Sequence, residues 1–256
     1  MIVRRLEVEE RALASPLGRT SPLLKLAIAL AWLVTLAFSY DVRPAAVIAA
    51  AAVLAGLSAG RLAPSRLAAG VAPLWAVAVG IGVTNMLFSA ANTDPSNAVL
   101  AMIGPLRLTA AGVAGGIGVA ARVVAVVAVG VVFGQTTDPT ALVDSLVQQG
   151  RAPERFAYGA LAAYQAIPRL AGQLGTLREA RRTRGLRAGW HPRMLVGLLV
   201  LAIRHGDRLA LAMDARGFGS GPRSRYREVR WSPLDAAVAA GALAVAVVAL
   251  LAGRPG

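Results

Sequence analysis

Five apolar stretches separated by short polar segments constrain the fold of this chain more than any other feature of its sequence. They occupy residues 23–38, 44–59, 67–90, 108–133 and 234–252. A helix needs about 20 mostly apolar residues to cross the hydrocarbon core of a bilayer, which is about 30 Å thick. The first two stretches are short, and a tight turn at residues 39–43 joins them. The sequence therefore predicts an all-α membrane protein with about five transmembrane helices.

A long arginine-rich segment, residues 135–231, separates the fourth apolar stretch from the last. Its apolar residues recur at helical spacing and predict helices over residues 140–148, 155–167, 168–184 and 192–216. Proline at position 168 is expected to begin the third of these helices. One apolar stripe is expected along the fourth, with residues 194–203 buried against other helices or the membrane interface. The stripe comprises Leu195, Leu199, Ala202, Gly206, Leu209 and Met213.

These features divide the chain into three predicted parts. Residues 1–134 form an N-terminal membrane domain with four transmembrane helices, and residues 135–231 form a cytoplasmic domain of long amphipathic helices. Residues 232–256 form the final transmembrane helix. Ser232 and Asp235 are spaced as a capping box at the start of that helix.

Basic residues give the predicted membrane protein an orientation. The formal net charge is +14, and the arginines concentrate in the N-terminal segment, in the loop after residue 59 and in the insert. Only Arg43, Arg107 and Arg254 fall on the opposite side. Because basic residues accumulate in cytoplasmic loops, the N-terminus is predicted to be cytoplasmic and the C-terminus to be outside. No cleavable signal peptide is expected, since the first apolar run begins only near residue 23.

The charge pattern also narrows the choice of partners. A basic chain can bind nucleic acid, an anionic membrane surface or an acidic protein. Here the arginines lie between apolar runs, and aromatic residues do not interleave with them as a base-stacking surface requires. We therefore expect contact with membrane lipid and no nucleic-acid partner.

Two predicted helices of the insert end in the same way. One ends in Thr183-Arg184-Gly185 and the other in Ala215-Arg216-Gly217. Glycine directly after a helix is the usual left-handed C-cap, and a cation in the last turn suits the helix dipole. A second interpretation assigns the two ends, called tips below, a shared role in binding. The guanidinium group of each arginine suits a carboxylate, and two equivalent tips would fit two equivalent acidic pockets of a dimeric partner.

No catalytic constellation emerges from the sequence. There is no cysteine, and no Gly-x-x-x-x-Gly-Lys-Ser/Thr phosphate loop, since Lys25 is the only lysine. The two histidines, His191 and His205, lack a metal-ligand pattern. Asp207 and Asp214 lie among arginines and are expected to be ion-pair partners. We predict no catalytic, cofactor-binding or metal-binding residue.

Two features of the fourth apolar stretch point to helix contacts. Arg122 lies within it, and a charge inside the membrane usually faces a bundle interior or another subunit. A structural or subunit-contact role is favoured over a role in substrate binding. Gly112 and Gly116 form a GxxxG pair, which predicts close packing against a neighbouring helix.

The paired Arg-Gly helix ends resemble those of the transmembrane T component of energy-coupling factor importers, the EcfT/CbiQ-like family. Residues 15–26, 135–139 and 151–155 also resemble segments of that family, whereas Thr183 stands where the family prefers alanine. The resemblance implies a non-catalytic scaffold in the bacterial inner membrane, whose long helices are coupling helices. It also implies three partner subunits. These are two ATP-binding-cassette ATPases, which carry ATP and magnesium and contact residues 183–185 and 215–217, and a small substrate-binding membrane subunit that receives a vitamin, vitamin precursor or metal ion.

Two other classes of membrane protein would show different features. A complete permease of another ABC class would bind substrate without a small membrane partner, but such permeases usually couple through one short cytoplasmic loop. An integral-membrane enzyme acting on lipid would need acids, histidines or metal ligands clustered at the membrane face, and the sequence offers few.

Overall fold

The computed structural model describes residues 14–39, 41–103, 106–186, 191–221 and 227–253. The chain separates into two compact units. Unit 1 comprises residues 1–138 and 230–256, and unit 2 comprises residues 139–229.

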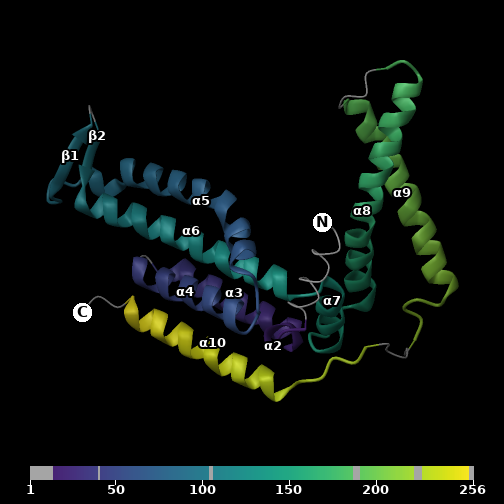
Figure 1. Ribbon diagram of the computed structural model, residues 1–256, viewed down its shortest axis with the longest axis horizontal. Coiled ribbons are helices and arrows are strands. Elements are labelled where there is room, and N and C mark those ends of the chain that lie inside the picture. Colours follow the sequence, from purple (N-terminus) through teal and green to yellow (C-terminus); the bar gives the residue numbers. More distant parts are fainter. Residues whose placement is uncertain (1–13, 40, 104–105, 187–190, 222–226, 254–256) are drawn as a thin grey trace. The chain divides into compact units, whose positions relative to one another are not determined.

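Helices make up most of unit 1 (Figure 1). Helix α6 packs most extensively against α5 and α4, while α10 lies against α4 and α3. Trp32, Leu36, Ile48, Ala125 and Ala249 are buried together where α3, α4, α6 and α10 meet. The elements are α2 (Pro16–Arg19), α3 (Pro22–Phe38), α4 (Val42–Ser58), α5 (Pro64–Leu87), η1 (Ala90–Asn92), β1 (Val99–Ile103), β2 (Leu106–Thr109), α6 (Ala110–Thr136) and α10 (Pro233–Ala252).

Three segments among the described residues are long and apolar enough to cross a membrane. They are Pro64–Asn92, Ala110–Thr136 and Pro233–Ala252. Helices Pro22–Phe38 and Val42–Ser58 are equally apolar in character but shorter, with 17 residues each. The chain is therefore a mostly helical membrane protein. Each predicted apolar stretch corresponds to one of these helices.

The expectation of an all-α fold is wrong in one place. Strands β1 and β2 form an antiparallel hairpin between α5 and α6, and Met102 pairs with Arg107. Leu108, the predicted first residue of the fourth apolar helix, belongs to strand β2, and α6 starts at Ala110 instead. Thr109 sets that boundary, because its side chain accepts a hydrogen bond from the Gly112 N–H and caps the helix.

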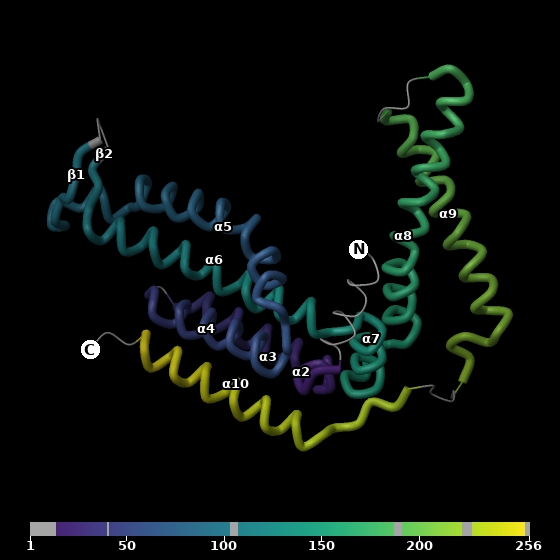
Figure 2. The backbone as a smooth tube through the Cα atoms, in the orientation of Figure 1, coloured from purple at the N-terminus to yellow at the C-terminus, as the bar shows by residue number. Residues whose placement is uncertain are grey.

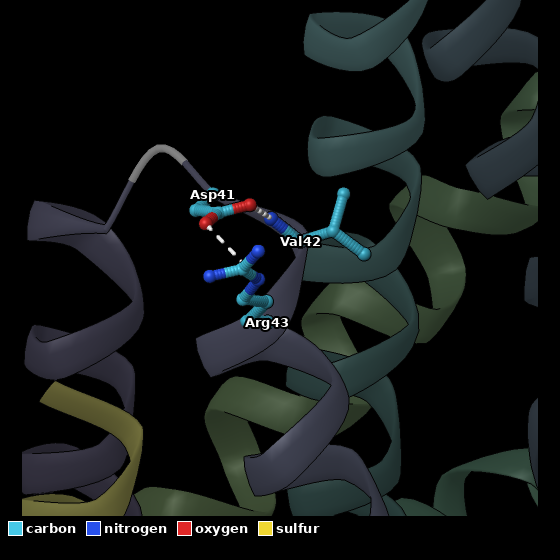
Figure 3. Close-up of polar contacts among 3 residues, drawn as sticks. All are labelled: Asp41, Val42 and Arg43. Atoms are coloured by element: carbon cyan, nitrogen blue, oxygen red, sulfur yellow. Dashed lines mark hydrogen bonds and ion pairs between the residues drawn. The ribbon is translucent and has the colours of Figure 1, made fainter. Parts of the chain in front are cut away.

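The starts of α4 and α10 show why these helices begin where they do. Asp41 accepts a hydrogen bond of 2.6 Å from the Val42 N–H, and Arg43 lies 4.0 Å from the same carboxylate (Figure 3). The predicted capping box at Ser232 and Asp235 is confirmed. Each cap supplies an acceptor for N–H groups that the first helical turn leaves unpaired.

Helices α5 and α6 approach each other through glycines. A Cβ added to Gly116 would lie 2.7 Å from the Gly82 carbonyl oxygen, and one added to Gly112 would overlap Asn92. A larger side chain at either position would force its neighbours to shift. This geometry confirms the close packing that the GxxxG pair predicts.

Unit 2 consists of α7 (Pro139–Gln148), α8 (Glu154–Thr183) and α9 (Pro192–Ala215). The predicted helix boundary at Pro168 is wrong, because this proline lies inside α8, a single helix of 30 residues. Proline removes one backbone hydrogen bond and disfavours the helix. Strong helix formers on both sides, with the Pro168 ring exposed to solvent, keep the helix intact across that position.

Within unit 2, burial of the apolar residues 194–203 of α9 is only partial: Met194 is 4% exposed, and burial of the others against further helices or the membrane interface stays a prediction. Leu195 and Leu199 remain 51% and 60% exposed within the described chain. Helix α8 contacts a face of α9 that includes Gly197 and His205. Since α8 covers only that narrow face, much of the apolar surface of α9 has no cover from unit 2.

Candidate functional site

The first Arg-Gly end is a Schellman motif. Arg184 is the C-cap of α8, with φ −87° and ψ 13°, and Gly185 follows in the left-handed region at φ +70°. The Leu186 N–H donates to the Arg181 carbonyl at 3.1 Å, and the Gly185 N–H donates to the Arg182 carbonyl at 3.0 Å. These two bonds satisfy carbonyls that the helix end would otherwise leave without partners.

The second Arg-Gly end repeats this geometry. Arg216 is the C-cap of α9, with φ −91° and ψ 8°, and Gly217 has φ +67°. The Phe218 N–H donates to the Met213 carbonyl and the Gly217 N–H to the Asp214 carbonyl, both at 2.9 Å. The predicted glycine C-caps are therefore confirmed at both ends. Arg184 and Arg216 occupy the same position in the two motifs, and both side chains are exposed.

Thr183 stands where the resembled family prefers alanine, and its hydroxyl bonds within its own helix. Its Oγ1 donates to the Ala180 carbonyl at 2.9 Å within the last turn of α8. Ala215, at the equivalent place in α9, has no hydroxyl. Because the extra hydroxyl bonds to its own helix, the motif that follows has the same backbone geometry as the second one.

Helices α8 and α9 cross in an antiparallel sense (Figure 2). Near one end of the pair, a Cβ added to Gly197 would lie 3.7 Å from Leu177. Further along, an Arg169 nitrogen lies 3.4 Å from the His205 ring. Residue numbers rise along α8 as they fall along α9 through these contacts, so the two C-terminal ends point in opposite directions. The Arg184 and Arg216 tips consequently lie at opposite ends of the pair.

The second tip is attached to the beginning of α8 by residues that the sequence did not single out. The rings of Tyr158 and Phe218 stand edge to face, with centroids 6.3 Å apart. The Tyr158 hydroxyl donates to Asp144 of α7 at 2.8 Å, and Arg155 donates to the Gly219 carbonyl at 3.4 Å. Phe218 directly follows the Arg-Gly pair, and this adjacency is the only sequence signal that could have drawn attention to it.

Arg122 of α6 has a partner inside unit 1. Its guanidinium donates to the carbonyl of Ser39, the C-cap residue of α3. A cation at this carbonyl complements the negative end of the helix dipole. This contact is structural, and a subunit contact by Arg122 stays a prediction.

Metal-ligand side chains do not gather anywhere in the described ranges. No group of three or more His, Asp or Glu residues there could hold a metal ion. The histidines of unit 2 have other neighbours: His191 caps the start of α9 by accepting from the Arg193 N–H at 3.1 Å, and His205 faces Arg169.

Comparison with known sequences identifies the family. Residues 14–226 match the profile of the CbiQ family, described as cobalt transport protein, and this match covers most of the chain. The chain belongs to the CbiQ family. This family comprises the transmembrane T components of energy-coupling factor transporters, which are non-catalytic transporter subunits.

Individual relatives of this CbiQ-family chain carry two kinds of name. A protein of Heliobacterium modesticaldum, named energy-coupling factor transporter transmembrane protein EcfT, is 28% identical over 88% of this chain and 89% of its own length. A protein of the same name from Listeria innocua is 29% identical over 54% of this chain. A putative ABC transporter ATP-binding protein of Bifidobacterium longum is 28% identical over 93% of this chain. The chain spans only 58% of the Listeria protein and 31% of the Bifidobacterium protein.

Proposed function

We propose that this CbiQ-family chain is a scaffold that passes ATP-driven motion from two ATPase subunits to a substrate-binding membrane subunit. The observation that carries the proposal is the pair of matching Arg-Gly ends on α8 and α9. Their backbone geometry is the same, their arginines are exposed, and the antiparallel crossing directs them to opposite ends of the helix pair. A dimer of ATPases would present the same surface twice, and each arginine fork suits a carboxylate on such a surface.

In this proposal the contacts to the ATPases are made by Thr183, Arg184 and Gly185 at one tip and by residues 215–217 at the other. ATP and magnesium bind to the partner subunits. The name of the Bifidobacterium relative supports this association, because a protein called ATP-binding contains a segment similar to nearly all of this chain. The present sequence has no phosphate-binding lysine loop of its own.

The membrane arrangement proposed here has five spans. Helices α3, α4, α5, α6 and α10 cross the bilayer, with the N-terminus in the cytoplasm and the C-terminus outside, as the distribution of arginines favours. Unit 2 then lies in the cytoplasm of a bacterial cell. Its uncovered apolar side chains, including Leu195 and Leu199 of α9, provide a surface for the substrate-binding subunit or for lipid. The cargo is a vitamin, a vitamin precursor or a metal ion, and the separate subunit recognises it.

The test is a double charge reversal at the tips, Arg184→Glu with Arg216→Glu, in the complete transporter. We expect the ATPase pair to be lost on co-purification and substrate uptake to fall to background. Reversing one tip should weaken assembly without abolishing it, because the tips contribute separately.

A matched control is available on the same helices. Arg178→Glu with Arg208→Glu makes the same change of charge at exposed positions about two turns before each tip. Normal assembly of this control with loss in the tip variant would support the proposal. Normal assembly and uptake in the tip variant would refute it. Substrate binding by the purified chain without a small membrane partner would favour a complete permease instead.

A further inference from the structure

Two cations hold α3 and α6 together in a reciprocal way. Lys25 of α3 donates from Nζ to the carbonyl of Thr136, the last residue of α6, at 2.6 Å. Arg122 of α6 donates to the carbonyl of Ser39, at the end of α3. The two contacts lie about four turns apart on each helix. Each basic side chain therefore binds the carboxyl-terminal carbonyl of the other helix.

Apolar packing between these helices is comparatively sparse. Helix α3 contacts α6 far less than α5 does, and a cavity of about 430 Å³ is lined by side chains from both α3 and α6. Ile28 and Trp32 line it from α3, and Val129 and Phe133 from α6. Because α3 and α6 make few contacts with each other, the directional bonds of Lys25 and Arg122 have a larger share in fixing this pair.

A buried carboxylate, Asp235, connects α10 to the start of α3, near the contact between Lys25 and α6. These contacts together are called the junction. Asp235, which is 3% exposed, accepts from the Ser21 N–H through Oδ1 and from the Ser232 N–H through Oδ2, both at 2.7 Å. Ser21 precedes α3 and Ser232 precedes α10, so one side chain joins the starts of both helices. Lys25 lies one turn further along α3 and is 6% exposed.

This junction coincides with the two places where the chain passes between unit 1 and unit 2. The chain leaves unit 1 after Asp138, two residues beyond Thr136, and returns at Arg230, two residues before Ser232. Lys25 bonds to the end of α6, where the chain leaves unit 1, and Asp235 bonds at the start of α10, where the chain re-enters it. Both contacts lie at the start of α3. Bonds to charged groups are about twice as strong as neutral ones, and burial strengthens them further.

We propose that Lys25 and Asp235 are positioning residues for energy coupling, which fasten both connections of the inserted unit to α3. Force transmitted through either connection then moves α3, α6 and α10 together. Without these bonds, α6 or α10 would shift relative to α3. The inference rests on the proposed coupling function for its consequence in transport. The fastening itself is a property of unit 1 and can be tested separately.

The transport test uses Lys25→Met in the complete complex, with Arg19→Met as the control. Arg19 is a nearby exposed cation, so the control removes the same charge without touching the junction. We expect Lys25→Met to assemble and hydrolyse ATP, but to import about tenfold less substrate per ATP, as loss of one buried charge-assisted bond suggests. Lys25→Arg should restore most of the ratio, since it keeps a cation at that position.

A merely structural role would lower assembly, hydrolysis and uptake in proportion and leave the ratio of substrate to ATP unchanged. That outcome, or an unchanged ratio with full activity, would overturn the proposal. Asp235→Asn provides a second variant that keeps the shape of the side chain and one acceptor oxygen. It should lower the ratio in the same direction.

A distance measurement tests the fastening without any assumption about coupling. The sequence has no cysteine, so spin labels can be placed at Leu30→Cys on α3 and Val126→Cys on α6, both at exposed positions. We expect one narrow distance distribution with Lys25 present and a broader one in Lys25→Met. An equally narrow distribution in both would refute the fastening even if the Arg184 and Arg216 tips prove essential. A broadened distribution with dispensable tips would instead refute the coupling function alone.

Discussion

The rings of Phe218 and Tyr158 pack edge to face, with their planes inclined by 79°. Phe218 belongs to the turn after α9, and Tyr158 lies in the first turns of α8. The pair therefore ties the Arg216 tip to the opposite end of the neighbouring helix. Because Tyr158 also bonds to Asp144, the second tip is connected to α7 as well.

We expect Phe218→Ala to loosen the second tip. An aromatic pair contributes about 0.5–1.5 kcal/mol beyond the area that it buries. Hydrogen exchange at residues 213–218 should therefore accelerate by roughly twofold to tenfold, a range that corresponds to this free energy. Tyr158→Phe serves as the companion variant, since it keeps the ring and removes only the bond to Asp144. Equal protection of residues 213–218 in Phe218→Ala and the original protein would contradict the expectation.

Alanine in place of either tip glycine should destabilise the tip. Gly185 and Gly217 have φ of +70° and +67°, where a Cβ costs about 1–2 kcal/mol. The effect should be larger at Gly217, because an added Cβ would also lie 3.0 Å from Ser220 Oγ, whereas Gly185 has open space around it. Gly185→Asn should be milder than Gly185→Ala, since asparagine tolerates this conformation. Local hydrogen exchange would rank the variants by how much each destabilises its tip. A milder effect for Gly217→Ala than for Gly185→Ala would contradict the expected ranking.

Gly116→Ala should destabilise unit 1 by about 1–3 kcal/mol, because the added methyl overlaps the Gly82 carbonyl and Met86 on α5. The matched control is Gly130→Ala in the same helix, where an added Cβ meets no atom within 4 Å. Alanine there should be neutral or stabilising by about 0.5–1 kcal/mol through its helix propensity. Thermal unfolding in detergent would compare the two variants. Similar unfolding temperatures would argue against the close approach of α5 and α6.

Pro168→Ala should strengthen α8. The substitution restores one backbone donor and removes a ring that disfavours the helix by about 3 kcal/mol. Slower hydrogen exchange around residues 164–168 is the expected result. If transport falls while protection rises, the proline is needed for the shape of α8. If protection is unchanged, the helix is already unstrained at this position.

The sequence predicts those features of the fold that depend on neighbouring residues. The apolar stretches, the capping box of Ser232 and Asp235 and the glycine C-caps at Gly185 and Gly217 all follow from residues close together in the chain. The break expected at Pro168 is wrong, because the helix formers on both sides outweigh a single proline. The hairpin of β1 and β2 was not predicted, since both strands are short and β2 overlaps the start of the fourth apolar stretch at Leu108.

Contacts between distant residues could not be predicted in the same way. Lys25 is separated from Thr136 by 111 positions, and Arg122 from Ser39 by 83. Nothing in the local sequence specifies that either cation meets a helix terminus. The part of the apolar surface of α9 that α8 covers likewise depends on where the two helices cross, which the local sequence does not specify.

The unequal lengths of the apolar helices have a consequence for the surrounding lipid. Helices α3 and α4 have 17 residues each, or about 25 Å of rise, whereas α6 has 27 residues, or about 40 Å. In the five-span arrangement proposed above, one bilayer about 30 Å thick has to match both lengths. Acyl chains beside α3 and α4 must shorten or tilt, while α6 must lean or thicken the lipid next to it. In that arrangement the thickness of the membrane would vary around the perimeter of the subunit, and a neighbouring membrane protein would meet a thinner bilayer on one side than on another.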